Sequence, residues 1–153
     1  MKTGASFSAC RSYRYALWRQ WARGPRVLFV MLNPSTADDR RDDPTIRRCI
    51  GFAKSWGFGS LAVGNLFALR TPSPRELAKS EFPVGTANDR CLRRLQRSAA
   101  LVLAAWGNHG ILYDRAATVR RMLIDPRTLG LTGSGQPRHP LYVAARTVPQ
   151  RWQ

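Results

Sequence analysis

The chain has few acidic residues. Of its 153 residues only 9 are Asp or Glu, against 25 Lys and Arg, which gives a formal net charge of +16 at pH 7. Such an excess of one sign is unfavourable for a protein whose partners are cations or neutral metabolites, and it favours a polyanion. An anionic membrane is the less favoured polyanion, because no amphipathic helix with a basic face and a broad apolar face is evident. We therefore expect a nucleic acid, DNA in single- or double-stranded form, as the partner.

Cysteine and histidine are also scarce. The three cysteines, Cys10, Cys49 and Cys91, lie far apart and form no C-x-x-C pair, which indicates neither a disulfide framework nor an iron–sulfur cluster. With only two histidines, a metal site has few candidate ligands. No apolar run reaches the length of a membrane-spanning helix, and residues 1–10 lack the apolar core of a secretion signal. We expect a cytoplasmic protein without a metal or other cofactor and without membrane contact.

Short clusters of Gly, Pro and Asp divide the chain at intervals typical of an alternating α/β domain. The length fits a single domain over residues 1–153. The clearest strand signal is the continuous apolar run from Val27 to Leu32, which is typical of a fully buried strand. We predict a monomeric three-layer α/β/α sandwich with a mainly parallel central sheet and an antiparallel strand at its N-terminal edge.

Helix signals lie between the predicted strands. Asp43 and Pro44 supply an N-cap and a first-turn proline for a helix that runs to about Trp56. The sequence Ser73-Pro74-Arg75-Glu76 combines a capping box with a first-turn proline and predicts a short helix. The remaining periodicities predict strands over 13–21, 61–69, 100–105 and 128–132, and helices over 88–98 and 113–123.

Three polar residues follow or end three of these strands. Asn33 follows the run 27–32, Asn65 lies near the end of 61–69, and His139 lies in the loop beyond 128–132. If the strands are parallel, their carboxyl ends share one edge of the sheet and the three side chains converge on one crevice. Taken singly, Asn33 before a proline is a common turn residue and His139 can brace a loop. Asn65 is harder to explain by folding alone, because a buried amide requires hydrogen-bond partners.

The motifs Leu32-Asn33-Pro34-Ser35, Asn65-Leu66-Phe67, Leu103-Ala104-Ala105-Trp106-Gly107 and His139-Pro140-Leu141 resemble, in this order, the motifs of the uracil-DNA glycosylase superfamily. The chain as a whole is also similar to a family of small bacterial and phage proteins catalogued as a domain of unknown function. The first resemblance implies a glycosylase that hydrolyses the N-glycosidic bond of uracil or a related damaged or modified base in DNA.

The resemblance also implies roles for individual residues. Asn33 would position the hydrolytic water, and His139 would hydrogen-bond the departing base. Asn65 would read the edge of the base, since its amide can pair with the N–H and carbonyl of a uracil ring. Leu32, Pro34, Ser35 and Phe67 would shape the base-binding pocket. The DNA-binding residues would be Arg70, Arg138, Leu141 and Tyr142.

The sequence departs from the superfamily pattern in three places. Ser35 stands where several glycosylase families have glycine, and Leu141-Tyr142 replaces the Ser-Pro that commonly follows the histidine motif. The aromatic residue that stacks on the base has its nearest equivalent in Thr45. These departures keep two alternatives open: a non-catalytic nucleic-acid or nucleotide-binding module, and a hydrolase of nucleosides or modified bases.

Overall fold

The apolar run predicted as a buried strand forms β3 (Arg26–Met31), an inner strand of the sheet in the computed structural model, which describes residues 1–152. The other strands are β1 (Lys2–Phe7), β2 (Arg14–Gln20), β4 (Ser60–Asn65), β5 (Leu101–Ala104), β6 (Arg127–Thr128) and β7 (Gln150–Arg151). The seven strands lie in the order β1-β2-β4-β3-β5-β6-β7. The four inner strands from β4 to β6 are parallel, whereas β1, β2 and β7 pair antiparallel with their neighbours.

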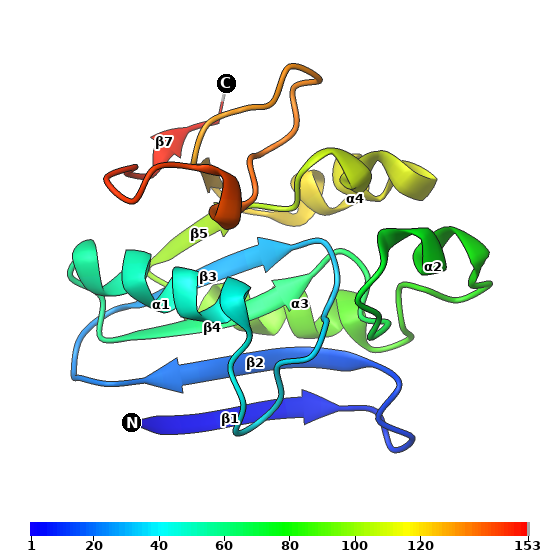
Figure 1. Ribbon diagram of the computed structural model, residues 1–153, viewed down its shortest axis with the longest axis horizontal. Coiled ribbons are helices and arrows are strands. Elements are labelled where there is room, and N and C mark those ends of the chain that lie inside the picture. Colours follow the sequence, from blue (N-terminus) through cyan, green and yellow to red (C-terminus); the bar gives the residue numbers. More distant parts are fainter. Residues whose placement is uncertain (153) are drawn as a thin grey trace.

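Helices cover both faces of the sheet. Helix α1 (Pro44–Ser55) packs on one face, and α3 (Asn88–Arg97) and α4 (Arg115–Met122) pack on the other (Figure 1). The short helix α2 (Pro74–Lys79) lies beyond the carboxyl ends of the parallel strands (Figure 1). This arrangement confirms the predicted α/β fold with a parallel centre and an antiparallel N-terminal edge.

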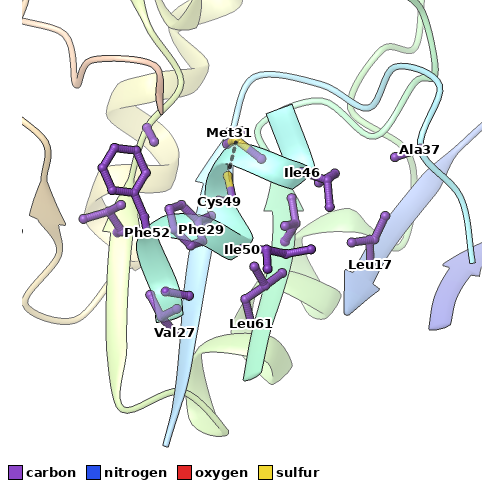
Figure 2. Packing of buried hydrophobic residues seen from close by; sticks show 14 of the residues in the cluster. Leu17, Val27, Phe29, Met31, Ala37, Ile46, Cys49, Ile50, Phe52 and Leu61 are labelled. Atoms are coloured by element: carbon purple, nitrogen blue, oxygen red, sulfur yellow. Dashed lines mark hydrogen bonds between the residues drawn. The ribbon is translucent and has the colours of Figure 1, made fainter. Parts of the chain in front are cut away.

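The side chains of β3 alternate between two apolar cores. Val27, Phe29 and Met31 point toward α1, where they meet Cys49 and Phe52 (Figure 2). The intervening Leu28 and Val30 belong to the core beneath α3 and α4. Because both faces of β3 are buried, nearly every residue of the strand must be apolar, which explains why its sequence is a continuous run rather than an alternating pattern.

Several predicted boundaries differ from the structure. The N-terminal edge has two strands instead of the one predicted. The additional strand, β1, was missed because its sequence, KTGASF, is largely polar and carries no clear apolar alternation. The predicted strand over 128–132 ends at Thr128, and Leu131 makes only an isolated bridge to Pro137. Ser73 precedes α2 as expected, but its side chain makes no capping hydrogen bond, so the predicted capping box is wrong.

The predicted helix over 113–123 begins later than expected. Residues Asn108–Asp114 form a 3-10 segment, and α4 starts at Arg115. Tyr113 and Asp114 have positive φ angles of 54° and 55°, a left-handed conformation that an α-helix does not accommodate. The chain therefore turns sharply before α4, which periodicity alone does not reveal.

Arg19 of β2 fastens the acidic loop that precedes α1. Its side chain is fully buried, and its Nε donates to Asp42 Oδ1 at 2.8 Å. Its Nη2 donates to the carbonyls of Asp38 at 2.6 Å and Arg41 at 3.1 Å. One guanidinium thus satisfies a carboxylate and two backbone acceptors of a loop that has little regular structure.

Replacement of Arg19 by Met should lower the free energy of unfolding by about 3 kcal/mol, because the carboxylate and carbonyls of the loop lose their buried donor. Urea denaturation measures this change. Arg40→Met is the matched control, since the Arg40 side chain is 90% exposed and its loss should change stability by less than about 0.5 kcal/mol. Equal midpoints for the two variants would show that the loop does not depend on Arg19.

Candidate functional site

The connections of the sheet open a crevice at the carboxyl end of β3. The chain leaves β3 toward α1 on one face, whereas the connections from the neighbouring strands β4 and β5 lead to α3 and α4 on the other face. Adjacent parallel strands whose connections separate in this way form a ligand crevice at their carboxyl ends. Figure 1 shows β3, β4 and β5 ending at the same edge of the sheet.

A cavity of about 690 Å³ occupies this edge, a volume typical of small-molecule sites. We call it the edge cavity. It is lined by Arg14, residues 31–33, Ser35, Asp43, Thr45, Ile46, Asn65, Thr71, Pro72, Pro74, residues 106–109, Thr132, Gly133, Arg138, His139, Leu141 and Tyr142. The three polar residues singled out in the sequence, Asn33, Asn65 and His139, are therefore brought together.

Asn65 is the most unusual residue of the cavity. It is the last residue of β4 and is only 1% exposed. Neither Nδ2 nor Oδ1 of its amide has a hydrogen-bond partner within residues 1–152. An unpaired buried amide is costly, by about 1–3 kcal/mol for each group. The Nδ2 donor and the Oδ1 acceptor of Asn65 therefore lie side by side at the cavity, and neither is hydrogen-bonded to another group of the described residues.

The backbone beneath Asn65 is held firmly by the opposite layer. Asn88 at the start of α3 donates from Nδ2 to the carbonyls of Asn65 at 2.9 Å and Leu66 at 3.1 Å. Arg115 at the start of α4 donates from Nε to the Leu66 carbonyl at 2.8 Å and pairs with Asp89. Asn88 and Arg115 thus position Asn65, and neither is distinguishable in the sequence, because a polar residue at the start of a helix is common.

In the amide of Asn33, the nitrogen forms hydrogen bonds within the protein and the oxygen is free to accept one. Its Nδ2 donates to the carbonyls of Thr71 at 2.7 Å and Pro34 at 3.0 Å. These two bonds fix the orientation of the amide, and they leave Oδ1 as its free acceptor at the cavity wall. Asn33 can therefore accept a hydrogen bond from water or from a ligand.

His139 reaches the cavity because its loop is fastened to two elements. The Gly107 N–H after β5 donates to the Pro137 carbonyl at 2.8 Å, and Trp106 Nε1 donates to Gln136 Oε1 at 2.9 Å. From the other side, Arg48 of α1 donates from Nε to the Pro140 carbonyl at 3.3 Å. The histidine loop is thus held between the end of β5 and α1.

The environment of His139 favours a neutral ring with the proton on Nε2. Its Nδ1 accepts the N–H of Leu141 at 3.1 Å and so cannot carry a proton in this arrangement. Burial lowers the pKa of His139 below its ordinary value of 6.5, although the nearby Asp43 carboxylate partly opposes this shift. At neutral pH the ring therefore offers an Nε2–H donor.

Two charged residues that were not predicted as site residues also line the cavity. Asp43, assigned only as a helix cap, caps α1 by accepting the Ile46 N–H at 2.9 Å, and it also lines the cavity. Arg14 of β2 lies at the same edge and is 2% exposed. The available signal for Arg14 was a charged residue directly before the apolar residues 15–18 of β2, whereas nothing in the sequence distinguished Asp43 from the other aspartates of the loop 38–43.

Three of the predicted site residues do not line the cavity. Pro34 is buried behind its wall, and Phe67 is fully buried in the core beneath α3 and α4, where it meets Tyr113 edge-on. Arg70 borders a separate shallow hollow and stacks over Phe7 with 4.8 Å between its Cζ and the ring centroid. Of the two arginines expected to bind DNA, Arg138 therefore lines the cavity and Arg70 does not.

The remaining predicted residues lie at the cavity as expected. Leu32 and Ser35 form part of its wall, and Arg138, Leu141 and Tyr142 lie toward its opening. Leu141 is 41% exposed and Tyr142 is 79% exposed, so a large ligand on the surface can contact both. Over residues 1–152, no group of three or more His, Cys, Asp or Glu side chains has a geometry that could hold a metal ion. Within the same range, no helix is long and apolar enough to cross a membrane.

The fold and the site together define the class of protein. It is an α/β protein with a polar cavity at the carboxyl ends of its parallel strands, where the connections of neighbouring strands lead to opposite faces of the sheet. The chain belongs to the family described as protein of unknown function (DUF1643), whose model matches residues 14–141. That range contains Asn33, Asn65 and His139, the three charged residues that line the cavity, and the four α-helices. Searches of curated proteins and of solved structures gave no match.

The two buried asparagines should respond oppositely to replacement by leucine. Asn65→Leu removes two unpaired buried groups and should raise the free energy of unfolding by about 1–3 kcal/mol. Asn88→Leu deprives two buried carbonyls of their donor and should lower it by about 2 kcal/mol or more. Urea denaturation of both variants tests this contrast, and destabilisation of Asn65→Leu comparable to that of Asn88→Leu would contradict it.

NMR titration of the imidazole rings should show His139 titrating below pH 6.5, with Nε2 protonated in the neutral form. The His139→Gln spectrum assigns the signal, because His109 is the only other histidine. Since the folded-state pKa is lowered, the stability that neutral His139 contributes is complete above about pH 6.5 and is lost as pH falls through the folded value. The stability difference between the parent and His139→Gln should therefore shrink between pH 7.5 and pH 5. A titration midpoint above 6.5 would overturn this assignment.

Proposed function

We propose that the protein is a monofunctional DNA glycosylase that hydrolyses the N-glycosidic bond of uracil or a related damaged or modified base. The observation that carries the proposal is the buried, unpaired amide of Asn65 at the edge cavity. A fold tolerates such a group when a ligand pairs with it, and an amide complements the adjacent N–H and carbonyl of a pyrimidine. The order of motifs along the chain supports the same reading.

In this proposal the target nucleotide leaves the base stack and enters the edge cavity, at a cost of a few kcal/mol. Asn65 pairs with the edge of the base. The apolar wall of Leu32 and Ile46 accepts the faces of the ring. Arg138, Leu141 and Tyr142 at the opening contact the neighbouring DNA, and Tyr142 is exposed enough to stack on an adjacent base.

Bond cleavage sends the electron pair of the glycosidic bond to the base nitrogen and leaves positive charge on the sugar. The Nε2–H of neutral His139 donates to the base oxygen where negative charge develops, a contribution of about 3–4 kcal/mol for one well-placed donor. The Asp43 carboxylate stabilises the positive charge on the sugar. Water held by Asn33 Oδ1 then forms the new bond to the sugar carbon, and its proton passes to the base.

A non-catalytic binding module is the second candidate, and it too has an observation in its favour. The carboxylate of Asp43 already caps α1 through Oδ1, and its Oδ2 accepts the Ala37 N–H at 3.4 Å. An amide such as Asn33 cannot act as a strong general base. If Asp43 serves only as a cap, the site can hold a base without hydrolysing its bond.

Base release from oligonucleotides carrying uracil, hypoxanthine, xanthine or 5-modified pyrimidines tests the function. We expect His139→Gln to slow the chemical step by about 100-fold or more with little change in DNA affinity. Asn65→Asp should shift preference away from uracil, because it replaces the amide donor by an acceptor. Asn33→Asp should preserve or raise the rate, since a carboxylate also orients the attacking water.

The control is Glu81→Gln, which introduces the same residue at an exposed position outside the edge cavity and should release base at the parent rate. DNA affinity measured in parallel should fall steeply with salt, as expected for contacts to phosphates. If the parent releases no base from any substrate but binds DNA, the non-catalytic module is the better account. If His139→Gln and Glu81→Gln are equally active, the assignment of His139 is wrong.

A further inference from the structure

Arg14 places a buried positive charge at the edge cavity. The residue is 2% exposed, and its Nη1 donates to the Ala37 carbonyl at 3.0 Å. No acidic side chain of residues 1–152 lies within ion-pair distance of its guanidinium, and its Nε has no hydrogen-bond partner there. Most of the five N–H donors of this group are therefore uncommitted.

Such an arrangement is costly for a purely structural arginine. Buried charges in folded proteins are normally paired with an opposite charge, as Arg19 and Arg115 are in this protein. Arg14 lacks that compensation, and burial lowers its pKa to about 10, which still leaves it charged at neutral pH. Among the charged groups around it, Asp43 and Asp38 raise the pKa of Arg14, whereas Arg70 and Arg19 lower it.

The strand order locates Arg14 relative to the rest of the site. Arg14 is on β2, next to the strand that carries Asn65, whereas the loop of His139 is fastened to the end of β5. From β2 to β5 there are three interstrand steps, or about 14 Å. A pyrimidine ring between Asn65 and His139 does not span this width, so the end of the cavity near Arg14 can receive a further group of the ligand.

We propose that Arg14 binds an oxyanion of the ligand, so that the edge cavity takes a nucleotide with its phosphate or a base with an acidic substituent. A planar guanidinium with free donors matches the oxygens of phosphate and carboxylate. The ligand then supplies the counter-charge that the protein omits. This proposal deepens the proposed function in its choice of substrate, although the anion site itself does not require base release.

Calorimetric titration of charged and uncharged probe pairs tests the proposal. The pairs are deoxyuridine monophosphate against deoxyuridine, and 5-carboxyuracil against uracil. The parent protein should bind at least one charged probe about tenfold or more tightly than its uncharged partner. If only deoxyuridine monophosphate binds more tightly than its uncharged partner, the anion that Arg14 binds is a nucleotide phosphate. If only 5-carboxyuracil does so, the anion is an acidic substituent of the base.

Arg14→Met should abolish this preference and leave the affinity for the uncharged probe unchanged. Arg121→Met is the matched control, because it removes one positive charge from an exposed position on α4 and should keep the preference. If Arg14→Met does not fold, the ¹⁵Nε signal of Arg14 in the parent gives the answer, since it should move with the charged probe only.

Equal binding of charged and uncharged probes, the absence of binding by any probe, or a preference that survives in Arg14→Met would overturn the proposal. The proposed function is tested separately. If the protein shows the Arg14-dependent preference but releases no base, the anion site is supported and the glycosylase function is refuted. If the protein releases base but shows no such preference, the glycosylase function is supported and the anion site is refuted.

Discussion

The parallel pairing of β3 with strands on both sides is the constraint on which the rest of this structure depends. Because β4 and β5 run in the same direction as β3, all three strands end at one edge. Backbone hydrogen bonds join the exits of these strands, including Leu66 N–H to the Met31 carbonyl at 2.8 Å and Ala105 N–H to the Val30 carbonyl at 2.8 Å. The edge cavity exists because the chain then leaves β3 toward one face and its neighbours toward the other.

At that edge the protein keeps polar groups that folding alone does not need. Asn65 has both amide atoms unpaired, and Arg14 has a charge without an ion-pair partner among the described residues. The buried guanidinium groups of Arg19 and Arg115 do pair with carboxylates, those of Asp42 and Asp89, and the other buried side-chain atoms without a partner among the described residues are Asn88 Oδ1 and Arg127 Nε. Asn65 and Arg14 differ from Asn88 and Arg127 in that they line the edge cavity, which is why we propose a ligand as their missing partner.

The large positive charge of the chain is not concentrated at the cavity. The cavity lining contains two arginines, Arg14 and Arg138, together with the carboxylate of Asp43. The exposed arginines of α3 lie on the opposite face of the sheet from α1. Overall charge can therefore raise the rate of encounter with a polyanion, whereas recognition inside the cavity rests on a small number of buried groups.

Much of the fold was predictable from the sequence because its signals are local. The apolar run of β3 and the Asp43-Pro44 start of α1 act through burial and capping within a few residues, and both elements were located within one residue of their observed bounds. The edge strands β1 and β7 escaped prediction, since an exposed or two-residue strand has no apolar pattern and is defined by its partner.

The convergence of Asn33 and Asn65 was also predictable, because parallel strands must end at one edge and both residues lie at strand ends in the sequence. His139 was expected at the same edge, but it reaches the cavity through hydrogen bonds of its loop to residues after β5 and on α1, which strand direction does not determine. The sequence by itself thus determined the element types, the excess of positive charge and three of the polar residues at the edge. Only the tertiary structure decided that Phe67 is core, that Arg70 lies elsewhere, and that Arg14 and Asp43 share the cavity. The physical reason is that burial and pairing are properties of the neighbours that a residue acquires on folding, and for Arg14 those neighbours lie more than twenty residues away along the chain.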